Sequence, residues 1–69
     1  MHAYREAQRL YGEAMVSTAT GAQQITRLEQ ILQQIGDLVP QAEPTERAAV
    51  LQLNTAVAEM LVRLTEEQK

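Results

Sequence analysis

Apolar residues recur along this chain in alternating steps of three and four, and this spacing limits the possible folds more than any other feature. Thr18 and Gly21 are weak positions in the series, and a proline-bearing break interrupts it before Val50. The series is Tyr4, Ala7, Tyr11, Ala14, Thr18, Gly21, Ile25, Leu28, Leu32, Ile35, Val39, Val50, Leu53, Val57, Met60 and Leu64. Such steps bring residues to one side of an α-helix, as in the seam of a helical bundle or coiled coil. The sequence therefore predicts an all-α protein.

Three helices are expected, over about 3–16, 22–38 and 45–65, with a frayed tail at 66–69. Pro40 ends the second helix, because proline has no backbone N–H and disfavours α geometry at the residue before it. Thr45 follows the break and is a candidate N-cap of the third helix.

Residues 17–21 (Ser-Thr-Ala-Thr-Gly) favour a break between the first two helices. Serine and threonine side chains compete for backbone hydrogen bonds, so they prefer caps to helix interiors, and Thr18 or Thr20 could cap a new helix. The apolar register nevertheless passes through this stretch without a skip. One long helix over 3–38 therefore remains an alternative.

The short link at 40–44 is typical of an antiparallel helical hairpin, to which the first segment adds an N-terminal helix. We expect one domain over residues 1–69. The chain has no Cys, Trp or Phe, so its core must be small and aliphatic. A domain of this size often gains stability from a partner chain or from a second copy of itself, and we expect the same here.

The third segment carries two apolar stripes. The second stripe, Leu51, Ala58 and Val62, lies roughly 130° around the helix from the main one. One neighbouring helix cannot cover both stripes, so this helix should pack against two neighbours. The predicted bundle seam is Ile25, Leu28, Leu32, Ile35, Val50, Leu53, Val57, Met60 and Leu64. The predicted partner-binding residues are Tyr4, Leu10, Tyr11, Leu51, Ala58 and Val62, since tyrosine combines apolar area with a polar tip that suits interfaces.

Catalytic and metal-binding patterns are missing from the sequence. His2 is the only histidine, and no Cys or second His accompanies it. The serine and threonine hydroxyls have no base beside them, so we expect no enzyme, no cofactor, no metal and no small-molecule ligand. The formal net charge is −3 and the six basic residues are scattered, which disfavours nucleic-acid binding. No apolar run approaches the roughly 20 residues of a membrane span, so we expect no membrane contact. The first residues do not resemble a signal peptide and the chain has no Cys, so we expect a cytoplasmic protein.

Residues 11–35 resemble the N-terminal part of flagellin export chaperones. The residues that carry the resemblance are Tyr11, Val16, Thr18-Ala19-Thr20, Ala22-Gln23, Ile25, Leu28 and Leu32. Gly21 stands where that family has a proline, and Leu28-Glu29-Gln30 stands where it has Leu-Tyr-Asp. The acidic hairpin closed by Pro44-Thr45-Glu46 also looks, in architecture alone, like the small helical co-chaperones of type III secretion needle subunits. The first resemblance implies a small cytoplasmic helical bundle that holds the helical end of an export substrate, and the second points the same way in architecture.

Two functions follow as hypotheses. The first is a non-enzymatic protein–protein interaction module, a small chaperone or adaptor of a secretion or flagellar system that holds an amphipathic helix of its partner. The alternative is a homo-oligomeric structural or regulatory bundle, in which a second copy of the chain covers the same apolar surface.

Overall fold

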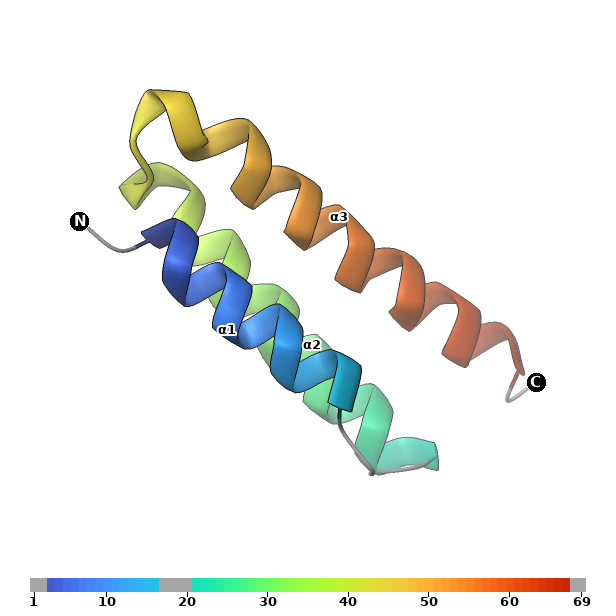
Figure 1. Ribbon diagram of the computed structural model, residues 1–69. Helices are drawn as coiled ribbons and strands as arrows, with labels where there is room; N and C mark the ends of the chain where they lie inside the picture. Colours follow the sequence, from blue (N-terminus) through green and yellow to red (C-terminus); the bar gives the residue numbers. More distant parts are fainter. Residues whose placement is uncertain (1–2, 17–20, 68–69) are drawn as a thin grey trace.

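The computed structural model describes residues 3–16 and 21–67, and almost all of them are helical. Helix α1 spans Ala3–Val16, α2 spans Gly21–Leu38, and α3 spans Pro44–Glu67, with a short 3₁₀ helix, η1 (Val39–Gln41), before α3. Each of the three α-helices contacts the other two, and they lie side by side along the long direction of the molecule (Figure 1). The predicted all-α fold, a helical hairpin with an additional N-terminal helix, is confirmed.

Helices α1 and α2 are separate elements that pack against each other (Figure 1). One long helix over 3–38 is therefore excluded. Helix α2 starts one residue earlier than predicted, at Gly21, whose φ of 62° lies in the left-handed region that favours glycine. Proline, with its φ fixed near −65°, could not take this conformation. The candidate caps Thr18 and Thr20 lie outside the described residues.

The link between α2 and α3 is short and hydrogen-bonded. The Ala42 N–H donates to the Val39 carbonyl at 3.2 Å, and Arg47 Nη2 donates to the Ala42 carbonyl at 3.2 Å. Helix α3 begins at Pro44, since proline is well suited to a first helical position where no N–H bond is needed. The predicted N-cap role of Thr45 is wrong, because Thr45 already lies inside the first turn.

The C-terminal boundary also differs from the prediction. Helix α3 continues through Glu66 and Glu67, which were expected to belong to a frayed tail. The apolar positions Leu61 and Leu64 still pack against the core one or two turns earlier, and they hold this end of the helix in place. Residues 68 and 69 lie outside the described part of the chain.

The core lies on the shared axis of the three helices. Its largest fully buried side chains are Leu28, Ile35, Val50 and Val57, and each such burial contributes about 1.5–3 kcal/mol. Helix α1 contributes mainly small residues, Ala3, Ala7 and Ala14, together with Leu10. Among the other predicted seam residues, those half-buried against the core are Leu32, Leu53, Met60 and Leu64. Ile25 is half-buried on α2 outside this cluster.

One polar side chain crosses the interface between α2 and α3. Asn54 Nδ2 donates to the Leu32 carbonyl at 2.8 Å, in the middle of α2. Gly36 lies beside the same amide, one turn further along α2. The contact shows which side of α2 faces α3.

Candidate protein-binding surface

Three of the predicted partner-binding residues form an apolar stripe on α3. Leu51 is 48% exposed and Val62 is 54% exposed, and Ala58 lies between them, half-buried. Their spacings of seven and four place them on one side of the helix. We call Leu51, Ala58 and Val62 the outer stripe. It lies apart from the side of α3 that carries Val50 and Val57 into the core.

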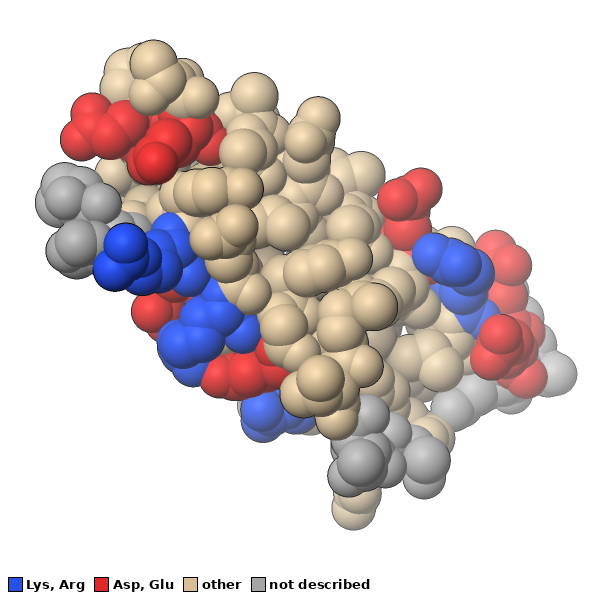
Figure 2. Space-filling model, viewed as in Figure 1, with Lys and Arg blue, Asp and Glu red and all other residues tan. Residues whose placement is uncertain are grey.

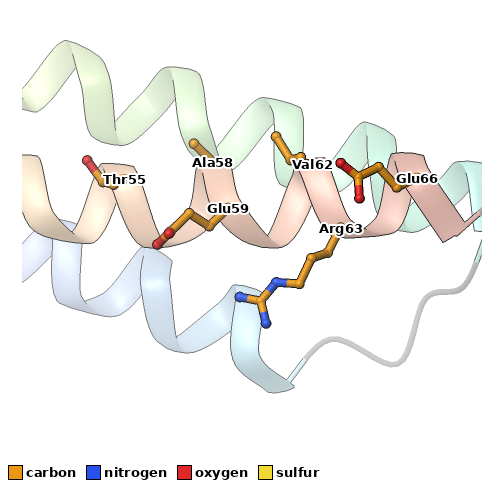
Figure 3. Close-up of a pocket in the computed structure, with 6 residues that line it drawn as sticks. All are labelled: Thr55, Ala58, Glu59, Val62, Arg63 and Glu66. Atoms are coloured by element: carbon orange, nitrogen blue, oxygen red, sulfur yellow. The ribbon is translucent and has the colours of Figure 1, made fainter.

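A shallow hollow surrounds the C-terminal part of the outer stripe. It is lined by Thr55, Ala58, Glu59, Val62, Arg63 and Glu66, all from α3. Figure 3 shows Ala58 and Val62 pointing towards the side on which α2 lies, whereas Arg63 points towards α1. The hollow therefore has an apolar floor and a charged rim, an arrangement typical of surfaces that bind another protein.

Leu10 does not belong to an exposed strip, contrary to the prediction. Its side chain is only 5% exposed and forms part of the core. Helix α1 packs against both α2 and α3, so its buried face is wider than one apolar stripe. Leu10 borders a hollow that is also lined by Gln34 and Leu38 of α2, which places it on the α2 side of α1.

Tyr4 and Tyr11 are half-buried and pack against the core from α1. The side chains of Ala58 and Val62 point away from α1 (Figure 3). The six predicted partner-binding residues therefore do not form a single surface. Of the six, the residues of the outer stripe, all on α3, are the ones that remain available on the surface.

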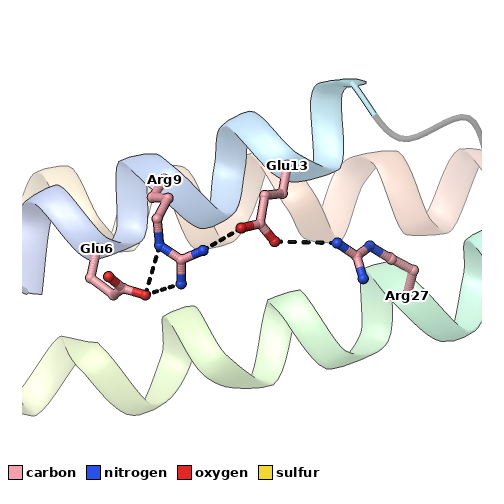
Figure 4. Close-up of polar contacts among 4 residues, drawn as sticks. All are labelled: Glu6, Arg9, Glu13 and Arg27. Atoms are coloured by element: carbon pink, nitrogen blue, oxygen red, sulfur yellow. Dashed lines mark hydrogen bonds and ion pairs between the residues drawn. The ribbon is translucent and has the colours of Figure 1, made fainter.

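The charged residues of α1 are largely engaged with one another. Arg9 pairs with both Glu6 and Glu13, and Arg27 Nη2 on α2 reaches Glu13 Oε1 at 3.2 Å (Figure 4). The hydrogen bond from Arg9 holds the pKa of Glu6 below its ordinary value. This ladder links α1 to α2 along their exposed edge. Two of the arginines, Arg9 and Arg27, are therefore engaged in ion pairs.

Charge is distributed unevenly over the surface. Figure 2 shows the face on which α1 lies in front of α2, with α3 beside them: charged residues occupy its edges and ends, and uncharged residues fill the centre. On α2 and α3, by contrast, Glu29, Glu59 and Glu66 are exposed and take part in no ion pair within the described ranges 3–16 and 21–67.

Sequence reasoning did not connect Glu29 with the outer stripe, although its spacing offered a signal. Ile25, Glu29, Leu32 and Gly36 follow in steps of four, three and four, so they share one side of α2. The Asn54–Leu32 hydrogen bond shows that this side adjoins α3. Ala58 lies one turn beyond Asn54 on the same side of α3. The outer stripe and this side of α2 therefore lie on adjoining parts of the surface.

Other exposed apolar side chains were also missed. Met15 is 57% exposed and Val16 is 75% exposed, both in the last turn of α1. Neither contributes to the hollow on α3. Val16 can therefore serve as a control position, because it is an exposed valine that lies outside the outer stripe.

Within the part of the chain that the structure describes, no three His, Cys, Asp or Glu side chains are grouped to hold a metal ion. No helix in that part has both the length and the apolar character needed to cross a membrane. Comparison of the chain with protein-family models, with curated proteins and with solved structures finds no match.

Proposed function

We propose that this protein is a non-enzymatic interaction module that holds an amphipathic helix of a partner protein. The observation that carries the proposal is the outer stripe. Leu51 and Val62 remain about half exposed on a helix whose other side already supplies the core. A small domain rarely aligns large apolar side chains on its surface without a binding role, whereas isolated ones need no explanation.

The resemblance of residues 11–35 to flagellin export chaperones supports a role as a small cytoplasmic chaperone or adaptor in a secretion or flagellar system. In such a role, the partner helix would lay its apolar face against α3, with anchors every three or four residues. Full burial of a leucine or valine contributes about 1.5–3 kcal/mol, and Leu51 and Val62 have about half of that still to gain. Two such anchors suit reversible capture better than permanent assembly.

A matched pair of valine variants tests the proposal. Val62→Glu places a charge on the outer stripe, and Val16→Glu makes the same change at an even more exposed valine outside it. Affinity capture from the source cells should recover a protein with the wild type and with Val16→Glu, but not with Val62→Glu. Circular dichroism should show that both variants stay helical. If Val62→Glu unfolds the chain, or captures the same protein as the wild type, the outer stripe is not a partner site.

Self-association is a second candidate, because the outer stripes of two antiparallel copies are complementary to each other. In an antiparallel pair of α3 helices, Leu51 of one copy would face Val62 of the other, and Thr55 would face Ala58. Large residues would thus meet large ones and small residues small ones. Sedimentation equilibrium decides between the candidates: a tight wild-type dimer that Val62→Glu splits would assign the outer stripe to a second copy.

A further inference from the structure

We infer that, while no partner helix is bound, the outer stripe is covered by the α3 helix of a second copy that lies antiparallel to the first. The inference rests on the proposed function, because it names the occupant of the same binding surface in the free protein. Partner capture and self-association would then compete for the outer stripe. Three features of α3 favour a second copy: the residues along its exposed side, their sizes, and the charges at its two ends.

An uncharged seam runs along the exposed side of α3 and includes the outer stripe. Its residues follow in alternating steps of three and four, the spacing of a helix that packs along a second helix. They are Ala48, Leu51, Thr55, Ala58, Val62 and Thr65. Ala58 is half-buried and the others are exposed. The Thr65 hydroxyl already donates to the Leu61 carbonyl at 2.8 Å, so it can enter an apolar contact without losing that hydrogen bond.

The seam is complementary to itself when the second copy runs in the opposite direction. Each position then faces one of similar size: the facing pairs are Leu51 with Val62, Thr55 with Ala58, and Ala48 with Thr65. Two-fold symmetry generates each pair twice, so the match extends over the whole seam. The rim carboxylate Glu59 would face the uncharged Asn54 of the second copy.

The charged residues at the two ends of the seam also match in this orientation. Arg47 precedes the first seam residue and Glu66 follows the last, and both are exposed. In the antiparallel pair, Arg47 of each copy is level with Glu66 of the other, with only the small Ala48 and Thr65 between them. Opposite charges at this level favour the antiparallel pair, whereas a parallel pair would set Arg47 level with Arg47 and Glu66 level with Glu66.

The dipole of α3 adds to this preference. Its last turn contains Glu66 and Glu67 and no basic residue, so two carboxylates lie at the negative end of the helix dipole. This arrangement is unfavourable for a helix that stands alone. An antiparallel α3 of a second copy brings its positive N-terminal end, with Arg47, beside these carboxylates. The unfavourable end of one copy therefore meets opposite charge in the pair.

The pair is expected to be weak and reversible. Leu51 is 48% exposed and Val62 is 54% exposed, so each has only about half of its surface left to bury. A contact along one helix lies at the small end of protein–protein interfaces, below roughly 1,200 Å² of buried surface. A partner helix with more apolar side chains can therefore displace the second copy.

Sedimentation equilibrium of the full chain measures the pairing. The dimer fraction should rise across about 0.01–1 mM protein, the range of a weak and transient interface. Val62→Glu should remove the dimer from this range, because it buries a carboxylate in the seam. Val16→Glu makes the same change at an exposed valine outside the seam and should leave the dimer unchanged.

Charge reversals test the antiparallel alignment. Glu66→Arg should weaken the dimer about ten-fold at low salt, because it turns two exposed ion pairs into two repulsions and each is worth a few-fold. Arg47→Glu/Glu66→Arg should return the affinity to within about three-fold of the wild type, since opposite charges face each other again. The control Glu67→Arg lies about 140° around α3 from Val62 and should change the affinity by less than about two-fold.

Circular dichroism checks that each variant stays helical. It matters most for the double variant, because Arg47 Nη2 also donates to the Ala42 carbonyl. If the double variant loses helical structure, the comparison of Glu66→Arg with Glu67→Arg still decides the alignment, since both add the same charge to the last turn of α3.

The possible results separate this inference from the proposed function. A wild-type chain that stays monomeric at about 1 mM overturns the inference, and the interaction module stands with another protein as its occupant. A dimer that Val62→Glu leaves intact forms elsewhere on the surface and also overturns it. Equal weakening by Glu66→Arg and Glu67→Arg overturns the antiparallel alignment. Affinity capture tests the proposed function separately, because Val62→Glu should lose the partner whether or not the free chain pairs.

Discussion

A comparison of two valines on α3 tests the division between core and binding surface. Val57 is fully buried, whereas Val62, five residues later, is 54% exposed. Replacing either with alanine removes two methyl groups, and burial is worth about 0.8 kcal/mol for each. Alanine returns up to about 0.7 kcal/mol through its higher helix propensity at both positions.

At Val57 the full transfer term of about 1.6 kcal/mol is lost, and the cavity left behind adds to it. We expect Val57→Ala to lower the free energy of unfolding by about 1–2.5 kcal/mol. At Val62 only about half of the transfer term is lost and the propensity gain nearly offsets it, so Val62→Ala should change stability by less than about 0.5 kcal/mol.

Urea and thermal unfolding followed by far-ultraviolet circular dichroism measure both values. For a domain of this size, Val57→Ala should lower Tm by about 5–20 °C, whereas Val62→Ala should leave Tm within a few degrees of the wild type. Equal destabilisation by the two variants would refute the reasoning, because it would mean that Val62 is covered in the free chain. The outer stripe could not then be an open binding surface.

The remaining predictions concern glycine and pH. Gly12→Ala and Gly36→Ala should each raise the free energy of unfolding, measured by urea titration, by about 0.5–1 kcal/mol. A Cβ at Gly12 meets nothing within 4 Å, and one at Gly36 meets only Asn54 Nδ2 at 3.7 Å. Gly21→Ala should lower the free energy of unfolding by about 1 kcal/mol or more, because the backbone φ at Gly21 is 62°. Because Arg9 lowers the pKa of folded Glu6, that contribution to stability is complete above the ordinary carboxyl pKa and is lost as the pH falls through the lowered value. Glu6→Gln should therefore flatten the acid limb of a stability–pH curve, and an unchanged limb would contradict the assignment.

The helices followed from the sequence because local signals agreed with the tertiary structure. The position of Pro40 predicted the end of α2, the Ser-Thr-Ala-Thr-Gly stretch predicted that α1 and α2 are two helices, and the apolar spacing identified buried residues such as Ile35 and Val57. The exposure of Leu51 and Val62 was also predictable, since two stripes on one helix exceed what this small bundle covers.

The prediction for Leu10 failed because the buried width of α1 depends on where both other helices lie. The helix periodicity of α1 alone cannot distinguish a face that meets one neighbour from a face that meets two. The side of α2 that adjoins the outer stripe was invisible for the same reason: Leu32 and Asn54 are 22 positions apart in sequence. They meet only because α2 and α3 pack against each other.

The Asn54–Leu32 hydrogen bond also bears on how many ways the two helices could align. Aliphatic seams repeat every turn, so α3 could slide along α2 by one turn and still meet apolar side chains. After such a slip, the Asn54 amide would leave the Leu32 carbonyl, and it would cost about 1–3 kcal/mol wherever the next turn of α2 presented no carbonyl to it. The amide therefore adds a polar requirement that the aliphatic seam alone does not impose. The contact between Asn54 and Leu32 marks the alignment that meets it.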